Sequence, residues 1–239
     1  MENIVVTGAA RGMGLEFARQ YLARGARVFA GVRNVATCDK LRALGEGRAD
    51  RLVVVPMDVA DEESIRQSAT IVAQQTDAVD VLINNAGIGG NSRDTGKTEE
   101  LGTFHFDDAW VVLRTMAVGP LLMVQEYLPM LKRSTGGAKV ANVSSGYGSI
   151  SGNTNRSPYY YSAAKSALHQ LMRSFAADGR QWNIATVLLD PGWVQTDMGG
   201  PNAPLPVDQS IGGMIQVIDN LTVETTGRFV KWDGSPMAW

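Results

Sequence analysis

The sequence predicts a doubly wound α/β fold, in which a parallel sheet of about seven strands is covered by helices on both faces. Short apolar runs rich in β-branched residues alternate with segments of helical periodicity along the whole chain. These runs are continuous rather than alternating with polar residues, which is typical of strands buried on both sides of a parallel sheet. No tandem repeat or linker divides the 239 residues. We therefore expect a single domain over residues 1–239.

The expected strands follow one another in chain order. They cover residues 3–8, 26–32, 51–57, 79–87, 138–145, 183–190 and 226–232. A helix is expected after Asp61, whose carboxylate suits an N-cap, with Ile65, Ala69 and Val72 on one face. Residues 106–134 predict a long helix, interrupted at Gly119-Pro120. Residues 88–104 and 191–208 are expected to be surface loops, the second a candidate substrate lid.

Composition and charge limit the classes of function. A hydrophobic fraction of 44% and a charged fraction of 19% are typical of a globular protein rather than a disordered one. The net charge of −2 offers no basic surface for nucleic acid or an anionic membrane. No signal-peptide pattern opens the sequence, and no apolar run approaches the roughly 18 residues of a membrane span. We expect a cytoplasmic protein whose partners are small molecules and copies of itself.

The cysteine and histidine residues give little sign of chemistry. The single cysteine, Cys38, cannot form an internal disulfide and is expected to be a helix-start or loop thiol rather than a nucleophile. His105 and His169 have no carboxylate or cysteine at metal-ligand spacing. No metal site is therefore expected.

The first candidate site is the glycine-rich stretch TGAARGMG, which follows the first expected strand and opens a helix. Glycines there let the backbone turn tightly and approach a pyrophosphate, which then lies at the helix N-terminus. A strand-to-helix turn without a ligand is the alternative, and the strand-loop-helix-strand context disfavours it. The spacing of Gly8, Gly12 and Gly14 resembles the TGxxxGxG of the short-chain dehydrogenase/reductase family.

Further motifs of that family follow in the family's order over nearly the entire chain. Asp58 resembles its adenine-contacting aspartate, and residues 84–87 match its NNAG. Ser145 ends the fifth strand, Tyr161 and Lys165 form YxxxK, and Pro191-Gly192 with Thr196 follow the sixth. The stretches PGWVQTDMGG and DGSPMAW look closest to the carbonyl-reductase-like, C-factor-like branch. The resemblance implies a Rossmann-like fold that binds NAD(P) through Gly8, Arg11, Gly12, Met13, Gly14, Arg33, Asp58, Val59, Asn85, Ala86, Gly87, Tyr161, Lys165, Pro191, Gly192, Val194 and Thr196.

Three consecutive tyrosines precede the lysine of the YxxxK motif, and helix geometry separates them. Residues four apart share a helix face, whereas residues five and six apart diverge by roughly 140° and 240°. Only Tyr161 therefore shares a face with Lys165, and Tyr159 and Tyr160 are expected to be packing or pocket-wall residues. A tyrosine has a pKa of about 10, so acid-base work near neutrality benefits from an adjacent cation such as Lys165.

By family resemblance, Ser145, Tyr161 and Lys165 are the catalytic residues of a carbonyl reduction. Hydride passes from nicotinamide C4 to the carbonyl carbon while Tyr161 protonates the oxygen, and Ser145 orients and polarises the carbonyl. Lys165 also hydrogen-bonds the cofactor ribose. Ser144 is the alternative to Ser145, although the family pattern uses the second serine of the pair.

The end of the second expected strand indicates the choice of cofactor. An acidic residue there binds the ribose hydroxyls of NAD, whereas an arginine accommodates the 2′-phosphate of NADP. Here Val32 takes the acidic position and Arg33 follows it. Arg11 adds charge but also occurs in NAD-using relatives, and a surface arginine that caps the strand is the alternative interpretation of Arg33. We predict NADP(H).

Three residues are candidates for the substrate pocket. Tyr147 and Trp193 follow Ser145 and Pro191-Gly192, where this fold gathers loops over the carboxyl ends of the strands. Met116 departs from the family, which places an asparagine there to hold a water that connects the lysine to solvent. A thioether cannot replace the amide. Either a main-chain carbonyl of the bent helix holds that water, or the tyrosine is reprotonated by another route, or catalysis is impaired.

The sequence thus predicts an enzyme that reduces an apolar or aromatic ketone or aldehyde with NADPH. A homodimer or homotetramer is implied, because the helices that hold Met116 and Tyr161 form subunit contacts in many family members. Two alternatives remain open: a catalytically weak NADP(H)-binding sensor or scaffold, and an NAD-dependent alcohol dehydrogenase.

Overall fold

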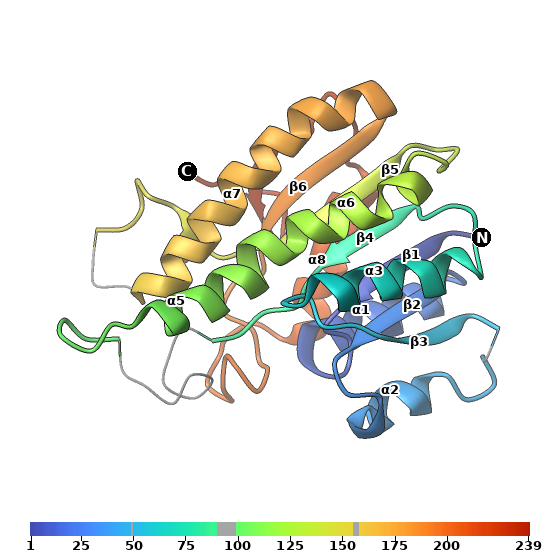
Figure 1. The fold of residues 1–239 in the computed structure, drawn as a ribbon, viewed down its shortest axis with the longest axis horizontal. Coiled ribbons are helices and arrows are strands. Elements are labelled where there is room, and N and C mark those ends of the chain that lie inside the picture. The colour runs from blue at the N-terminus through green and yellow to red at the C-terminus, as the bar shows by residue number, and fades with distance from the viewer. Residues whose placement is uncertain (49, 90–98, 155–157) are drawn as a thin grey trace.

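The computed structural model describes residues 1–48, 50–89, 99–154 and 158–239. Its centre is a parallel seven-stranded sheet in the order β3-β2-β1-β4-β5-β6-β7 (Figure 1). The expectation of a doubly wound sheet of about seven strands is therefore confirmed. The strands are β1 (Asn3–Thr7), β2 (Arg27–Val32), β3 (Leu52–Pro56), β4 (Val81–Asn84), β5 (Ala138–Val143), β6 (Ile184–Asp190) and β7 (Arg228–Lys231).

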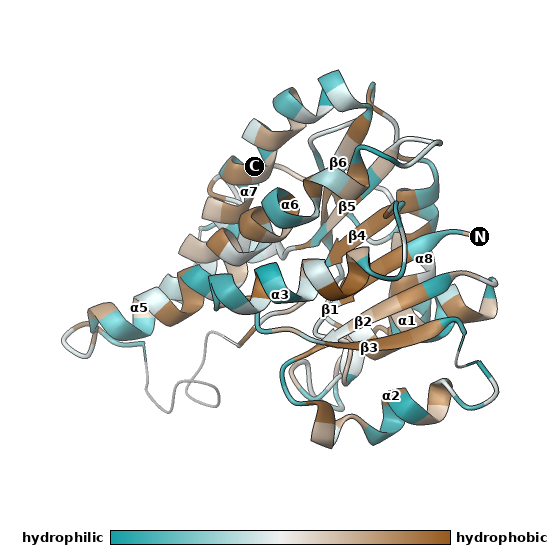
Figure 2. Cartoon of the chain, turned by 45° about the vertical axis from the view of Figure 1, so that its right-hand side comes forward, coloured by the Kyte–Doolittle hydropathy of each residue, from teal (hydrophilic) through white to brown (hydrophobic). Residues whose placement is uncertain are grey.

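Helices cover both faces of this sheet, and each face has its own apolar core. One core joins the strands to α1 and α8, and the other joins them to α3, α6 and α7. In Figure 2 the central strands are coloured as hydrophobic along much of their length, as the continuous apolar runs predict. The α-helices are α1 (Gly12–Ala23), α2 (Asp39–Leu44), α3 (Glu62–Ala73), α5 (Phe106–Leu113), α6 (Gly119–Leu131), α7 (Tyr159–Gly179) and α8 (Val207–Asp219).

A local signal sets the start of one helix, and the cysteine lies at the start of another. Asp61 caps α3, because its carboxylate accepts hydrogen bonds from the backbone N–H groups of Glu63 and Ser64. Ile65 on this helix is fully buried, as its helical periodicity predicts. Cys38 is buried directly before α2, which agrees with a helix-start thiol.

The long helix is distorted rather than broken. A π-helical turn, η2 (Arg114–Val118), joins α5 to α6, so that helical structure runs from Phe106 to Leu131. Pro120 has no N–H group and cannot make the α-helical bond to the Met116 carbonyl. Gly119 lies so close to the loop after β3 that a Cβ on Gly119 would be 2.2 Å from the Val59 carbonyl oxygen. The Gly119-Pro120 pair therefore changes the hydrogen bonding of the helix without ending it.

The same run corrects our expectation about apolar segments. Phe106–Leu131 is long and apolar enough to cross a membrane by length and composition, with a mean hydropathy of 1.2 in its most apolar window. Almost half of that window, 44%, is buried inside the molecule. The run packs against α7 and α3, so its composition is explained by its place as a helix that covers the sheet.

The two expected loops differ in what the structure describes. Residues 90–98 of the first lie outside the described residues. The second is irregular between β6 and α8, except for a parallel bridge between Val194 and Leu205. It lies at the carboxyl end of β6, where a doubly wound fold places its ligands.

Candidate active site

The glycine-rich stretch forms the tight β1–α1 turn that its sequence predicts. Gly8 and Gly12 have φ of +69° and +55°, a conformation that residues with a Cβ rarely adopt. Gly14 is constrained by packing instead, since a Cβ there would lie 2.2 Å from the Gly8 carbonyl oxygen. These three positions leave the N-terminus of α1 open to an approaching phosphate.

Asn85 braces this turn from the end of β4. Its side-chain amide donates a 2.9 Å hydrogen bond to the Thr7 carbonyl, and the hydroxyl of Thr7 accepts hydrogen bonds from the backbone of Asn85 and Ala86. The buried side-chain oxygen of Asn85 has no hydrogen-bond partner among the described residues. An orphaned acceptor beside a glycine cradle is suited to a polar ligand, so the residues present fit a dinucleotide.

Residues after β2 and β3 lie where the adenosine end of a dinucleotide would bind. Arg33 follows β2 and is exposed. Within the described part of the chain, no hydrogen bond or ion pair engages its guanidinium. Asp58 follows β3, and its carboxylate accepts a hydrogen bond from the backbone of Ala60. Val59 beside it is buried, and its carbonyl lies against Gly119 at the start of α6.

The loop after β6 reaches back to the glycine turn. Thr196 lies beside the turn, since a Cβ built on Gly12 would be 3.7 Å from its methyl carbon. Arg11 forms an exposed ion pair with Asp197 of the same loop at 3.2 Å. Arg11 is thus engaged by this loop, whereas Arg33 is not. Pro191 and Val194 are buried, Gly192 has φ of +78°, and Met13 lies half-buried in the first turn of α1.

Tyr161 and Lys165 lie one turn apart on α7. The ammonium nitrogen of Lys165 is 5.7 Å from the centre of the Tyr161 ring, and it donates a 2.8 Å hydrogen bond to the carbonyl of Val143 at the end of β5. Burial lowers the pKa of Lys165 to about 8. The ammonium form therefore still prevails at pH 7.

Ser145 lies just after β5 and close to the hydroxyl of Tyr161, and its Oγ accepts a 3.2 Å hydrogen bond from the backbone N–H of Tyr147. Burial raises the pKa of Tyr161, the hydrogen bond from Ser145 opposes that rise, and the charge of Asp190 adds to it. The net shift is upward, so in this structure the effect of burial exceeds the lowering that we expected from Lys165. A phenol that stays protonated at neutral pH is suited to donating a proton.

The other two tyrosines of the triplet point away from this group. Tyr160 donates a hydrogen bond from its hydroxyl to the His105 carbonyl, and its backbone N–H donates to the Glu99 carboxylate. Tyr159 is partly exposed and packs edge-on against Phe104. Both have packing roles, which agrees with the helical-face argument.

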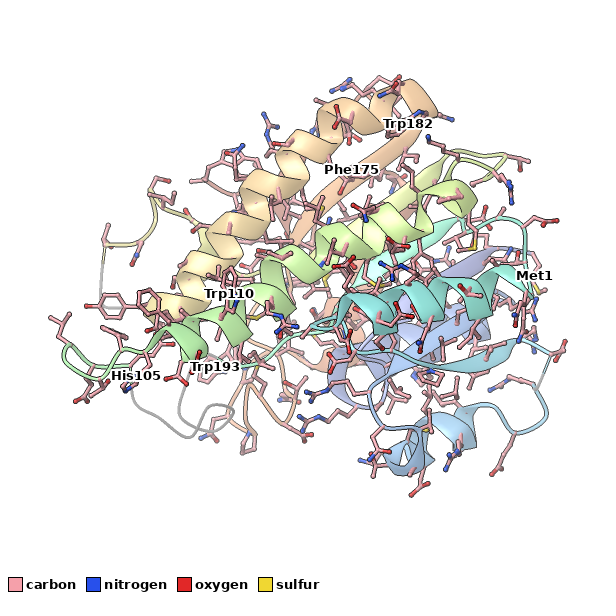
Figure 3. All side chains as sticks on the ribbon, viewed as in Figure 1. Met1, His105, Trp110, Phe175, Trp182 and Trp193 are labelled. Carbon is pink, nitrogen blue, oxygen red and sulfur yellow. The ribbon has the colours of Figure 1, made fainter. Side chains whose placement is uncertain are left out.

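The three pocket candidates differ in their surroundings. Tyr147 is 53% exposed and meets the Tyr161 ring edge-on, with ring centres 6.1 Å apart. Trp193 is exposed at the end of the molecule that also holds His105 (Figure 3), and its indole N–H donates to the Gly199 carbonyl. Met116 is 1% exposed and belongs to an apolar cluster against which Tyr161 packs, so it lies beneath the site rather than at its surface. Substrate contact by these three residues stays a prediction.

Sequence reasoning missed Asp190, gave His169 no place at the site, and considered Ser144 only as the alternative to Ser145. Asp190 ends β6 and raises the pKa of Tyr161. Ser144 and His169 are buried and hydrogen-bonded to each other at 2.7 Å. Asp190 directly precedes Pro191-Gly192, and His169 comes four residues after Lys165. Their proximity to motif residues was the available signal.

Known proteins share this sequence and architecture. A model of the family described as short chain dehydrogenase matches residues 2–204. C-signal of Myxococcus xanthus is 43% identical over 166 residues, which cover 69% of this chain and 95% of that protein.

Among solved structures, the NADPH-bound carbonyl reductase from chicken fatty liver is 34% identical, with a TM-score of 0.90 over 100% of this chain and 99% of that one. Carbonyl reductase Sniffer of D. melanogaster is 31% identical, with a TM-score of 0.92 and full coverage of both chains. The family match extends over most of the chain, and the motifs converge at one end of the sheet. By these similarities the chain belongs to the short-chain dehydrogenase family and is an oxidoreductase related to the carbonyl reductases.

Proposed function

We propose that this protein reduces a ketone or aldehyde to an alcohol with NADPH, and that Tyr161 is the proton donor. The observation that carries the proposal is the convergence of Ser145, Tyr161 and Lys165 at the carboxyl end of β5, at the same edge of the parallel sheet as the glycine turn after β1. A nicotinamide cofactor bound along that turn supplies the hydride.

The chain's own residues orient the carbonyl and deliver the proton. The Ser145 hydroxyl hydrogen-bonds the substrate oxygen and holds it beside the Tyr161 hydroxyl. Tyr161 then passes its proton to that oxygen as negative charge develops there. Lys165, held by the Val143 carbonyl, provides a positive charge next to the tyrosinate that remains.

NADP(H) rather than NAD(H) is favoured by the last residue of β2 and the residue that follows it. Val32 offers no carboxylate to repel a 2′-phosphate, and the exposed guanidinium of Arg33 is available for it. The carbonyl reductase from chicken fatty liver binds NADPH, and a carbonyl reductase from Pseudomonas aeruginosa PAO1, 28% identical with a TM-score of 0.84, binds NADP.

The substrate is proposed to be apolar or aromatic. Tyr147 and Trp193 are both largely exposed near the carboxyl ends of the strands, and the Tyr147 ring lies against Tyr161. Exposed aromatic rings beside a catalytic group offer flat apolar contacts to a substrate. We further propose that the protein acts in the cytoplasm as a homodimer or homotetramer.

The test is steady-state oxidation of NADPH with a panel of aliphatic and aromatic aldehydes and ketones. Turnover of aromatic carbonyls with NADPH, and much less with NADH, is the expected result. Tight NADPH binding without turnover of any panel member would favour a sensor or scaffold. Efficient NAD-dependent oxidation of alcohols, with little carbonyl reduction, would favour the alcohol dehydrogenase alternative.

A further inference from the structure

His169 is a buried titratable residue that the proposed reduction does not use. It lies on α7 one turn after Lys165 and two turns after Tyr161, so the three side chains occupy neighbouring positions on one face of the helix. It is 4% exposed, and its Nε2 atom is 2.7 Å from the hydroxyl of Ser144, which is 2% exposed. This is a direct hydrogen bond between α7 and the residue after β5.

Ser144 lies at the end of β5 between two residues that contact the proposed catalytic residues of α7. The residue before it, Val143, accepts the hydrogen bond from the Lys165 ammonium, and the residue after it is Ser145, which contacts Tyr161. The backbone N–H of Ser144 also donates a 2.7 Å hydrogen bond to the Leu189 carbonyl of β6. Movement of Ser144 would therefore displace both of its neighbours relative to α7.

The imidazole also supports the turn that carries Tyr147. A Cβ on Gly148 would lie only 2.6 Å from the His169 ring, so the backbone of this turn rests directly on the ring. Phe229 of β7 and Trp239 pack against the ring, with ring centres 4.3 Å and 5.5 Å from its centre. The ring is thus held on several sides, and its hydrogen bond to Ser144 has little freedom to move.

The charge state of His169 suits a permanent hydrogen bond. Burial and the nearby charge of Lys165 lower the pKa of His169 to about 4. The ring is therefore neutral at neutral pH and adds no second cation beside Lys165. A neutral imidazole has one donor and one acceptor nitrogen, so the Ser144 hydroxyl can always take the complementary role. A phenylalanine would fill the same space but leave the buried Ser144 hydroxyl unpaired.

We propose that Ser144 and His169 are a positioning pair that fixes the spacing between Ser145, just after β5, and Tyr161 and Lys165 on α7. The pair acts through these residues and does not touch the substrate. This inference rests on the proposed function, because it assigns the pair to the same catalytic group.

The experiment compares Ser144→Ala, His169→Phe and the double variant with wild type, with His169→Gln as the conservative variant. Glutamine can still hydrogen-bond Ser144. Ser68→Ala is the matched control, because buried Ser68 pairs with the Tyr127 hydroxyl at 3.0 Å between α3 and α6, away from the site. The measurements are kcat, KM, NADPH dissociation constant and Tm for each variant.

The expected result is a loss in kcat of about 10- to 100-fold for Ser144→Ala and His169→Phe, because misplaced reacting groups lose rate without losing affinity. The NADPH dissociation constant should stay within about twofold of wild type. The double variant should be no slower than the worse single variant, since each single substitution already removes the same hydrogen bond between Ser144 and His169. His169→Gln should recover most of the rate, and Ser68→Ala should lower Tm alone.

A second readout needs no turnover. The ultraviolet absorbance titration of Tyr161, taken as the difference from Tyr161→Phe, gives the pKa of this tyrosine. Loss of the pair should raise that pKa, because the hydrogen bond from Ser145 that lowers it becomes less well held. The other charged or titratable groups that face Tyr161, namely Lys165, Asp190 and Tyr147, are unchanged in these variants.

The outcomes separate this inference from the proposed function. If wild type turns over no carbonyl, the proposed function fails and the tyrosine titration alone decides the pair. An unchanged kcat together with a lower Tm, as in Ser68→Ala, would overturn the positioning role, and so would an unchanged Tyr161 pKa in an inactive protein. If His169→Phe does not fold, Ser144→Ala, which removes a single oxygen atom, carries the test.

Discussion

Tyr161 differs from its two neighbours in what its hydroxyl meets. Its hydroxyl lies close to Ser145, whereas that of Tyr160 donates a hydrogen bond to the His105 carbonyl. Tyr161→Phe should therefore lower kcat by roughly 10² to 10⁴, the usual contribution of a positioned acid, while NADPH still binds. Tyr160→Phe is the matched control and should change kcat little. A dead Tyr160→Phe beside an active Tyr161→Phe would show that the helical-face argument is wrong.

The proposed preference for NADPH likewise depends on a single charged side chain, that of Arg33. Arg33→Ala should raise the KM for NADPH far more than that for NADH, because it removes a charge-assisted contact made only to the 2′-phosphate, of order 1.5 to 3 kcal/mol. The kinetic constants for both cofactors provide the measurement. Arg11→Ala is the comparison, since Arg11 is paired with Asp197. Equal effects of Arg33→Ala on NADPH and NADH would remove the basis for assigning the 2′-phosphate to Arg33.

At the scale of the element, the π-helical turn between α5 and α6 explains how Met116 can stand at the family's asparagine position. Pro120 has no N–H group to donate to the Met116 carbonyl, whichever side chain residue 116 carries. The hypothesis is that this main-chain carbonyl holds the water that the asparagine holds in relatives. The Met116 side chain itself is buried between Gly87 and the residues beside Tyr161.

Met116→Asn should then change kcat by less than about tenfold, far less than the loss expected for Tyr161→Phe. Steady-state kinetics of the two variants under the same conditions compare them. The control is Tm, because a polar amide placed in this apolar cluster is itself destabilising. A thousandfold gain in kcat would instead identify the native chain as an impaired reductase and favour the sensor hypothesis.

For the whole molecule, burial of Lys165 links stability to pH. Its pKa is about 8 in the folded chain and about 10.4 in an unfolded one, so between these values the unfolded state binds more protons. The contribution of Lys165 to the free energy of unfolding therefore rises as pH increases from 8 to 10. The same contribution is lost as pH falls through 8.

Lys165→Met should remove this dependence. Relative to the variant, wild type should gain roughly 2 kcal/mol between pH 8 and pH 10, as measured by urea unfolding at both values. Tyr21 and Tyr127, whose pKa values burial raises, affect both proteins alike. Parallel stability curves for wild type and Lys165→Met would contradict the prediction that Lys165 is buried as an ammonium.

The sequence by itself determined the sheet, the glycine turn and which of the three tyrosines shares a helix face with Lys165. These depend on local periodicity and spacing: continuous apolar runs specify buried strands, and a four-residue interval on a helix specifies a shared face. Tertiary structure alone decided the surroundings of those residues. Asp190, Ser144 and His169 meet the catalytic group because parallel strands end at one edge of the sheet and α7 packs over them. Burial there, rather than neighbouring residues in sequence, sets the pKa values of Tyr161 and Lys165, since desolvation depends on contacts between distant segments.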